Sequence, residues 1–169
     1  LLLLIPILSV GQIIKEGSRQ IHLDFHTSGL IENIGENFSK EQFKKALKIG
    51  NVNSINIFGK GHHGYSYYNT KIGTRHPHLK FDLLKEQIEA CHEMGVTAQV
   101  YFTVGWSQKD ADDHPEWILK DKNGTTNKLE VLKKLGPNDR LPNFTWRLLA
   151  PSNGYDEFIL KQVEEICMN

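Results

Sequence analysis

Three short runs of β-branched and aromatic residues, each followed by a segment with helical spacing, constrain the fold of this chain more than any other feature. The runs lie near residues 21–26, 52–58 and 96–103, and their composition is typical of buried strands. Because helical segments follow the strands, the order along the chain is strand, helix, strand, helix. That order predicts parallel strands joined by helices that cover the sheet.

The first two helical segments carry their own start and stop signals. In the first, Ser39 precedes Gln42 by three residues and forms a capping box, and Gly50 ends the segment. The second segment ends at Gly95 and has apolar residues at intervals of three or four. Its apolar positions are Phe81, Leu84, Ile88 and Cys91. These signals predict two amphipathic helices, each with one face toward the sheet.

A third amphipathic helix is predicted to begin near Pro151, with Ser152 or Asn153 as its N-cap. Its spacing places one apolar face along the helix, which we expect to pack against the rest of the chain. The residues of that face are Phe158, Ile159, Val163 and Ile166.

Parallel strands with outer helices form either a doubly wound sheet or a (β/α)8 barrel. Residues 26–29, which follow the first strand, lack the glycine spacing of a dinucleotide-binding loop, and this disfavours the nucleotide-binding sheet. A full barrel typically needs about 250 residues, whereas this chain has 169. We therefore expect an α/β chain that forms the N-terminal half of a (β/α)8 TIM barrel and ends before the fourth strand.

The first eleven residues resemble the end of a secretory signal peptide. Residues 1–8 are apolar apart from Pro6, and the small residues Ser9 and Gly11 stand at the two positions that a signal peptidase reads. The run is far shorter than the roughly 20 residues of a membrane span. We expect a signal-peptide remnant at residues 1–11, a barrel portion at residues 12–169, and a secreted or periplasmic protein without a membrane span.

The composition limits the partners and the cofactors of this chain. Twenty basic and twenty acidic residues give a formal net charge of zero, so no basic excess suggests a nucleic-acid partner. The two cysteines, Cys91 and Cys167, cannot build a disulfide framework and are not part of a metal-binding pair. We therefore interpret both cysteines as buried, inert thiols, and we expect no cofactor.

Two long loops hold the residues that could do chemistry. Residues 59–80 include four of the eight histidines and three tyrosines, and residues 104–147 include all three tryptophans. Loops of this length within a compact domain are usually functional. In a barrel they would open on the C-terminal face of the strands, where active sites lie.

One hypothesis for this face is a metal site. His22, Asp24 and His26 alternate along the first predicted strand, so their side chains would lie on one face of the sheet. Two imidazoles and a carboxylate are a common ligand set, which His62 and His63 could complete. Histidines inside a strand more often form hydrogen bonds within a barrel, so a metal-dependent hydrolase is the alternative interpretation rather than the first.

The other hypothesis is a sugar site. Such a site needs polar groups that can each bind a hydroxyl pair, together with aromatic faces that stack on the apolar side of a pyranose ring. Histidine, lysine, tyrosine and tryptophan near the strand ends suit both tasks. The candidate substrate-binding residues are His26, Lys60, His62, His63, Tyr101, Trp106 and Trp146. For any single aromatic residue, including Tyr65, Tyr67 and Tyr68, packing is an equally good interpretation.

Several of these residues stand in strings that resemble a known enzyme family. Phe25-His26 closes the first run, residues 60–65 close the second with the string KGHHGY, and Tyr101 with Trp106 follows in the third. These strings resemble the α-L-fucosidases of glycoside hydrolase family 29. From about Arg19 onward, the chain is even more similar to the hypothetical glycosyl hydrolase families related to them. The shared strings also include His76-Pro77, His114-Pro115-Glu116-Trp117 and a helix that begins at Tyr155.

The resemblance implies a TIM-barrel glycosidase that hydrolyses O-glycosidic bonds and binds a carbohydrate substrate. It carries four residues over as sugar contacts, namely His26, His62, Tyr101 and Trp106. In the fucosidases the second strand ends in lysine, two histidines, aspartate, glycine and an aromatic residue. Here Gly61 stands at the first histidine and His63 stands at the aspartate.

The resemblance also implies where the catalytic carboxylates lie. The nucleophile of the family is an aspartate at the end of the fourth strand and the acid/base lies further on, so both are expected beyond Asn169. The fragment itself is then expected to be inactive, because glycoside hydrolysis requires two carboxylates. We interpret Asp24 as a hydrogen-bond acceptor within its strand and Glu116 as part of the first turn of a short helix after Pro115. A non-catalytic carbohydrate-binding barrel is the third interpretation.

Overall fold

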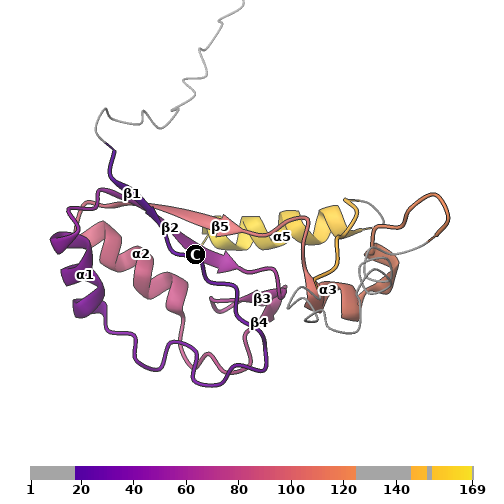
Figure 1. Ribbon diagram of the computed structural model, residues 1–169, viewed down its shortest axis with the longest axis horizontal. Coiled ribbons are helices and arrows are strands. Elements are labelled where there is room, and N and C mark those ends of the chain that lie inside the picture. Colours follow the sequence, from indigo (N-terminus) through magenta and orange to yellow (C-terminus); the bar gives the residue numbers. More distant parts are fainter. Residues whose placement is uncertain (1–17, 125–145, 152–153, 169) are drawn as a thin grey trace, which may run out of the picture.

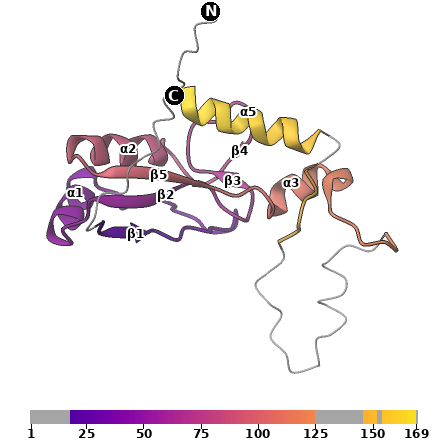
Figure 2. The ribbon, with the colours of Figure 1, turned by 90° about the horizontal axis from the view of Figure 1, so that it is seen from above.

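The fold is built around three parallel strands. The computed structural model describes residues 18–124, 146–151 and 154–168. Strands β1 (Gln20–His22) and β5 (Thr97–Phe102) both pair in parallel with the central strand β2 (Ser54–Lys60). Figure 2 shows the three strands side by side in the order β1, β2, β5. The prediction of a parallel sheet is therefore confirmed.

The register of the sheet brings the C-terminal ends of its strands together. His22 pairs with Asn56, Asn56 pairs with Gln99, and Phe58 pairs with Tyr101. Beyond Phe58 the register shifts, so that Lys60 pairs with Phe102. Such an irregularity changes the direction in which the next side chain, that of Lys60, points.

Helices α1 (Lys40–Ile49), α2 (Leu83–Glu93) and α5 (Tyr155–Met168) correspond to the three predicted helices. The Ser39 hydroxyl caps α1 by accepting a hydrogen bond from the Gln42 backbone N–H at 3.3 Å, as the capping box predicts. Gly95, just after α2, has a φ of +66°, which glycine adopts without the penalty of a side chain. The predicted caps Ser152 and Asn153 lie outside the described residues.

The main core lies between the sheet and the helices α1 and α2, which pack against each other beside the strands (Figure 1). Ile55 and Ile57 are fully buried on the helix side of β2. Burying one such side chain contributes about 1.5–3 kcal/mol, so this layer fixes the sheet on the helices. The buried residues of the core are Leu47, Ile55, Ile57, Tyr68, Leu84, Cys91 and Val96.

Two very short strands within the first long loop were not predicted. Strand β3 (Tyr65–Ser66) pairs antiparallel with the end of β2, and β4 (Thr74–Arg75) pairs in parallel with β3. Tyr67 and Tyr68 are buried in the core clusters, so for these two residues the packing interpretation is confirmed.

The described part of the second long loop contains helix α3 (Gln108–Asp113) and the 3-10 helix η1 (Pro115–Trp117). The short helix predicted after Pro115 is therefore confirmed, and Glu116 lies in its first turn. None of the helices within the described residues is long and apolar enough to cross a membrane.

Three local predictions were wrong. Strand β1 ends at His22 rather than near residue 26, because the ladder with β2 ends after the hydrogen bond from the Leu23 N–H to the Asn56 carbonyl. On α5, Val163 is 39% exposed and its neighbour Gln162 is fully buried, since Gln162 accepts a hydrogen bond from the buried Lys60. Cys167 is exposed, whereas Cys91 is buried as predicted.

Candidate functional site

Two histidines form the centre of a polar cluster at the C-terminal ends of β1 and β2. The Nδ1 atom of His26 accepts a hydrogen bond from the backbone N–H of His62 at 2.9 Å. The two imidazole rings are stacked, with their centroids 3.8 Å apart. Because the hydrogen bond joins the segments that follow two different strands, it fixes both histidines relative to the sheet.

Aromatic side chains surround these histidines. The Tyr101 hydroxyl, from β5, lies 2.8 Å from Nε2 of His62 in a hydrogen bond. The Trp146 ring lies edge-on to His62, with a centroid distance of 4.5 Å, and the rings of His26 and His63 each lie 5.4 Å from it. The structure therefore brings together five of the seven candidate residues: His26, His62, His63, Tyr101 and Trp146.

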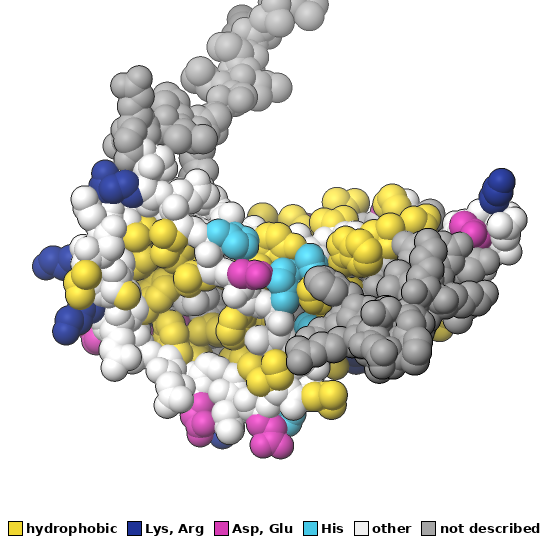
Figure 3. Space-filling model, in the orientation of Figure 1, with side chains coloured by type: hydrophobic (Ala, Val, Ile, Leu, Met, Phe, Trp, Pro, Cys, Tyr) yellow, Lys and Arg dark blue, Asp and Glu magenta, His cyan; other side chains and the backbone are white. Residues whose placement is uncertain are grey.

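Asp24 lies at the open side of this cluster. Its Oδ1 atom is 3.1 Å from Nε2 of His26, and the Asp24 side chain is 71% exposed whereas that of His26 is 16% exposed. The expectation of a strand-interior acceptor was wrong, because β1 ends two residues earlier. Figure 3 shows histidine side chains beside an acidic side chain on this face of the molecule.

Burial favours the neutral form of the histidines of the cluster. It lowers the pKa of His26 below the ordinary value of 6.5, although the Asp24 carboxylate opposes the shift. Burial also lowers the pKa values of His62 and His63, and in each case a neighbouring histidine adds to the effect. Neutral imidazoles can donate at one nitrogen and accept at the other, which suits them to binding hydroxyl groups.

Helix α3 holds the loop that carries the two adjacent histidines. The backbone carbonyl of His62 accepts a hydrogen bond from the N–H of Gln108 at 3.0 Å, and that of His63 accepts from the N–H of Lys109 at 3.1 Å. These N–H groups belong to the first turn of the helix, where they have no partner within the helix itself. The cluster is therefore supported by backbone contacts from a third element.

Lys60 does not join the cluster, contrary to the sequence-based expectation. Its side chain is fully buried, and its ammonium group donates to the Asp110 carboxylate at 2.5 Å and to Oε1 of Gln162 at 3.2 Å. The ammonium group also lies over the rings of Phe102 and Phe158, whose centroids are 5.4 and 5.3 Å away. The register shift after Phe58 explains the difference, because it turns Lys60 toward α5.

Asp110 was not among the sequence candidates. Its carboxylate also accepts a hydrogen bond from the Ser107 hydroxyl at 2.7 Å. Burial lowers the pKa of Lys60, and the neighbouring Asp110 charge opposes that shift. No sequence signal separates this aspartate from the other acidic residues of the loop, because its partner Lys60 is 50 positions away.

Trp106 lies apart from the ring contacts of the cluster. Its backbone forms an isolated bridge with Leu148, its carbonyl accepts from the Thr103 hydroxyl, and the residue is 40% exposed. Within the described residues, the Trp106 ring has no aromatic partner.

The predicted metal ligands are not assembled as a ligand set. Within the part of the chain that the structure describes, no three histidine, cysteine, aspartate or glutamate side chains are grouped so that they could hold a metal ion. The His22 ring instead packs near the rings of Phe58 and Tyr101, with centroids 5.4 and 5.8 Å away. His22 and Asp24 are also exposed rather than buried along a strand.

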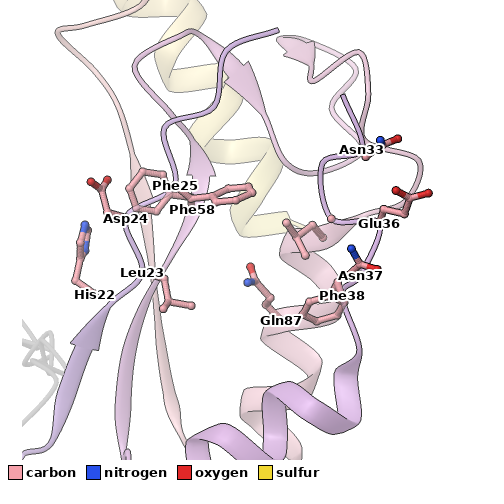
Figure 4. A pocket seen from close by; sticks show the side chains of 12 residues that line it. His22, Leu23, Asp24, Phe25, Asn33, Glu36, Asn37, Phe38, Phe58 and Gln87 are labelled. Carbon is pink, nitrogen blue, oxygen red and sulfur yellow. The ribbon is translucent and has the colours of Figure 1, made fainter. Parts of the chain in front are cut away.

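A pocket of about 500 Å³ lies beside the cluster, between the end of β1 and helix α2. Figure 4 shows His22 and Asp24 on one side of the chain and Leu23 on the other, facing Gln87. The wall is largely apolar and includes Phe25, Phe38, Phe58 and Leu83. The pocket is therefore continuous with the cluster, because Asp24 and His22 line it together with the apolar side chains.

A solved structure with substantial sequence identity shares this arrangement of elements. The α-L-fucosidase isoenzyme 2 from Paenibacillus thiaminolyticus is 40% identical over 88% of this chain, with a TM-score of 0.76. The match covers 21% of the fucosidase chain, so this chain spans about a fifth of the length of that protein.

A second solved structure supports the fold alone. The noncanonic maltogenic α-amylase AmyB from Thermotoga neapolitana is 18% identical, with a TM-score of 0.51 over 86% of this chain and 35% of its own.

The comparison with curated protein sequences gave no significant match. The sequence profile of the family described as hypothetical glycosyl hydrolase 6 matches residues 39–169, which is most of the chain. The chain therefore belongs to the hypothetical glycosyl hydrolase 6 family.

Proposed function

We propose that this chain is the N-terminal part of a longer α-L-fucosidase-like glycosidase, which hydrolyses O-glycosidic bonds. The observation that carries the proposal is the cluster of His26, His62, Tyr101 and Trp146 at the ends of parallel strands, in a chain 40% identical to an α-L-fucosidase over 88% of its length. Neutral imidazoles and a phenol can bind hydroxyl groups, while the indole offers a face for the apolar side of a sugar ring.

The proposed architecture is the first part of a (β/α)8 barrel. Three parallel strands and the share of the fucosidase chain that this chain covers support it. The catalytic nucleophile and the acid/base would then lie in the remaining strands, and hydrolysis would proceed with retention through two carboxylates. The sites described here would bind the sugar rather than perform the bond cleavage.

The test is a hydrolysis assay of the complete protein with aryl glycosides. We expect cleavage of an α-L-fucoside first and of a galactoside second, and nuclear magnetic resonance should show a product that keeps the anomeric configuration of the substrate. Sugar binding without any hydrolysis would contradict the proposal and indicate a non-catalytic carbohydrate-binding barrel. Stoichiometric zinc or manganese that is lost in a His26→Ala variant would indicate a metal-dependent hydrolase.

We also propose that the protein is exported, to the periplasm or to the medium. The support is the apolar run at residues 1–8 with small residues at positions 9 and 11; these residues lie outside the described part of the structure. N-terminal sequencing of the protein from its native host should show cleavage near residue 11. An uncleaved protein recovered from the cytoplasm would contradict export.

A further inference from the structure

The hydrogen bonds around His26 determine which of its nitrogens carries the proton. Nδ1 accepts from the backbone N–H of His62 at 2.9 Å, so it cannot carry a hydrogen of its own. In the neutral imidazole the proton must then be on Nε2. His26 can therefore offer a substrate one donor, at Nε2, and no acceptor.

Asp24 supplies the hydrogen-bond acceptor that His26 lacks. Its Oδ1 atom lies 3.1 Å from Nε2 of His26, and a carboxylate accepts hydrogen bonds only. The side chain is 71% exposed, and within the described residues His26 is the one basic side chain in close contact with it. Most of the carboxylate is therefore accessible and can accept a hydrogen bond from a ligand.

A hydroxyl group is the ligand that matches this pair. It donates one hydrogen and accepts others, so one oxygen can donate to Asp24 while it accepts from Nε2–H of His26. The two protein atoms are 3.1 Å apart, which allows one hydroxyl oxygen to lie within hydrogen-bond distance of both. A carboxylate or phosphate ligand fits less well, because the Asp24 charge would repel it.

We propose that Asp24 is a substrate-binding residue, whose carboxylate and the His26 Nε2–H bind one sugar hydroxyl in its donor and acceptor roles together. This inference rests on the proposed sugar-binding function of the cluster. His26 is then both a donor to the substrate and, through Nδ1, the residue that holds the His62 backbone in place.

The experiment is isothermal titration calorimetry of the complete protein with L-fucose and with D-galactose. The Asp24→Asn variant keeps the size of the side chain but removes its charge and one acceptor. Because hydrogen bonds to charged groups are among the stronger ones, we expect affinity for the preferred sugar to fall about tenfold or more. Glu157→Gln, which removes an exposed carboxylate on α5, is the matched control and should bind as the wild type does.

A deoxy-sugar series separates direct contact from a structural effect. In the wild type, removing the contacted hydroxyl from L-fucose should weaken binding, and for one of the 2-, 3- and 4-deoxy sugars this loss should vanish in Asp24→Asn. A merely structural role would lower the affinities for all of these sugars by the same factor. That uniform result, or an unchanged affinity in a variant with a wild-type melting temperature, would overturn the inference.

The result is distinguishable from the outcome of the hydrolysis assay. If the protein binds L-fucose through Asp24 but cleaves no glycoside, the inference stands and the proposed hydrolysis fails. If the protein cleaves a fucoside and Asp24→Asn shows the wild-type pattern with the deoxy sugars, the inference fails alone. If the wild type binds neither sugar, the inference is overturned as well.

Discussion

Two acid–base pairs near the ends of the strands, Lys60–Asp110 and His26–Asp24, differ in burial. Lys60 and Asp110 are 0% and 3% exposed, and hydrogen bonds from Lys60 to Gln162 and from Ser107 to Asp110 complete their surroundings. His26 and Asp24 are 16% and 71% exposed, and Asp24 retains free acceptor capacity. Burial makes the first pair inaccessible to a ligand, whereas the second pair is accessible. Burial, rather than residue type, therefore distinguishes the structural pair from the pair that we propose to bind the sugar.

The buried Lys60–Asp110 pair also helps to hold the histidine cluster in place. Lys60 directly precedes the segment that carries His62, and Asp110 belongs to the helix whose first turn donates to the carbonyls of His62 and His63. The Lys60–Asp110 pair thus joins β2 to α3 close to the cluster. Loss of this pair should lower the stability of the fold. It should affect the cluster only by changing the positions of His62 and His63.

The largest expected effect is on the buried pair. Asp110→Ala leaves the Lys60 ammonium group buried without its carboxylate, and breaking such a pair typically costs about 3–5 kcal/mol. We expect a large fall in the melting temperature of the purified protein, measured by circular dichroism. A loss as small as that of an exposed carboxylate variant would show that the pair is not buried as described.

A double variant provides the control for this prediction. Replacing both charges, in Lys60→Met with Asp110→Leu, removes the uncompensated charge and keeps apolar bulk next to Phe102 and Phe158. Such replacements are often neutral or stabilising. The double variant should therefore melt at a higher temperature than Asp110→Ala; if it melts lower, desolvation is not the dominant cost.

The contrast between the two pairs also shows what the sequence could predict. The strands, the helices and the Ser39 cap follow from local periodicity and capping, which depend on neighbouring residues only. The direction of Lys60 does not, because it depends on a register shift between two strands far apart in the sequence. The partner of Lys60 was missed for the same reason.

The same contrast between local patterns and contacts of residues far apart in the sequence applies to the candidate site. A period of two places His22 and Asp24 on one side of the chain, and the structure keeps that alternation even beyond the end of β1 (Figure 4). Whether these side chains are buried depends on which elements cover them, which no local pattern reveals. Trp146 joins His62 across 84 positions of sequence, and only its residue type marked it as a candidate.

A second, intermediate effect is expected at the open cluster. His62→Ala removes the hydrogen bond to Tyr101 and the ring that stacks on His26 and meets Trp146 edge-on. We expect kcat/KM of the complete protein for its accepted glycoside to fall at least about tenfold, which corresponds to about 1.4 kcal/mol, while the protein remains folded. An unchanged kcat/KM for every accepted glycoside would remove His62 from the site.

His92 is the matched control for that variant. It is an exposed histidine in the last turn of α2, on an element that does not carry the cluster. His92→Ala should leave kcat/KM unchanged, so an equal loss in both variants would indicate a general effect on the fold.

The smallest effect is the dependence of stability on pH, and it tests the link between Asp24 and His26. Burial lowers the folded-state pKa of His26, while the Asp24 charge raises it. Between the ordinary value of 6.5 and the lower folded-state pKa, the unfolded chain holds more protons, so the free energy of unfolding falls as pH decreases through this window. Asp24→Asn removes the opposing charge, so the folded-state pKa of His26 should fall further and the pH range over which stability is lost should become wider. At pH 7.5 the variant should lie within about 0.5 kcal/mol of the wild type, as is usual for exposed positions.

At pH 5.5 we expect the Asp24→Asn variant to have lost slightly more stability than the wild type, measured as the change in melting temperature between the two pH values. Glu157→Gln removes a carboxylate that lies on α5 rather than beside His26, so it should show the wild-type difference. A smaller loss in Asp24→Asn than in the wild type would mean that Asp24 does not raise the pKa of His26. Asp24 and His26 would then lie close together without electrostatic coupling, and only Lys60 and Asp110 would form a coupled pair.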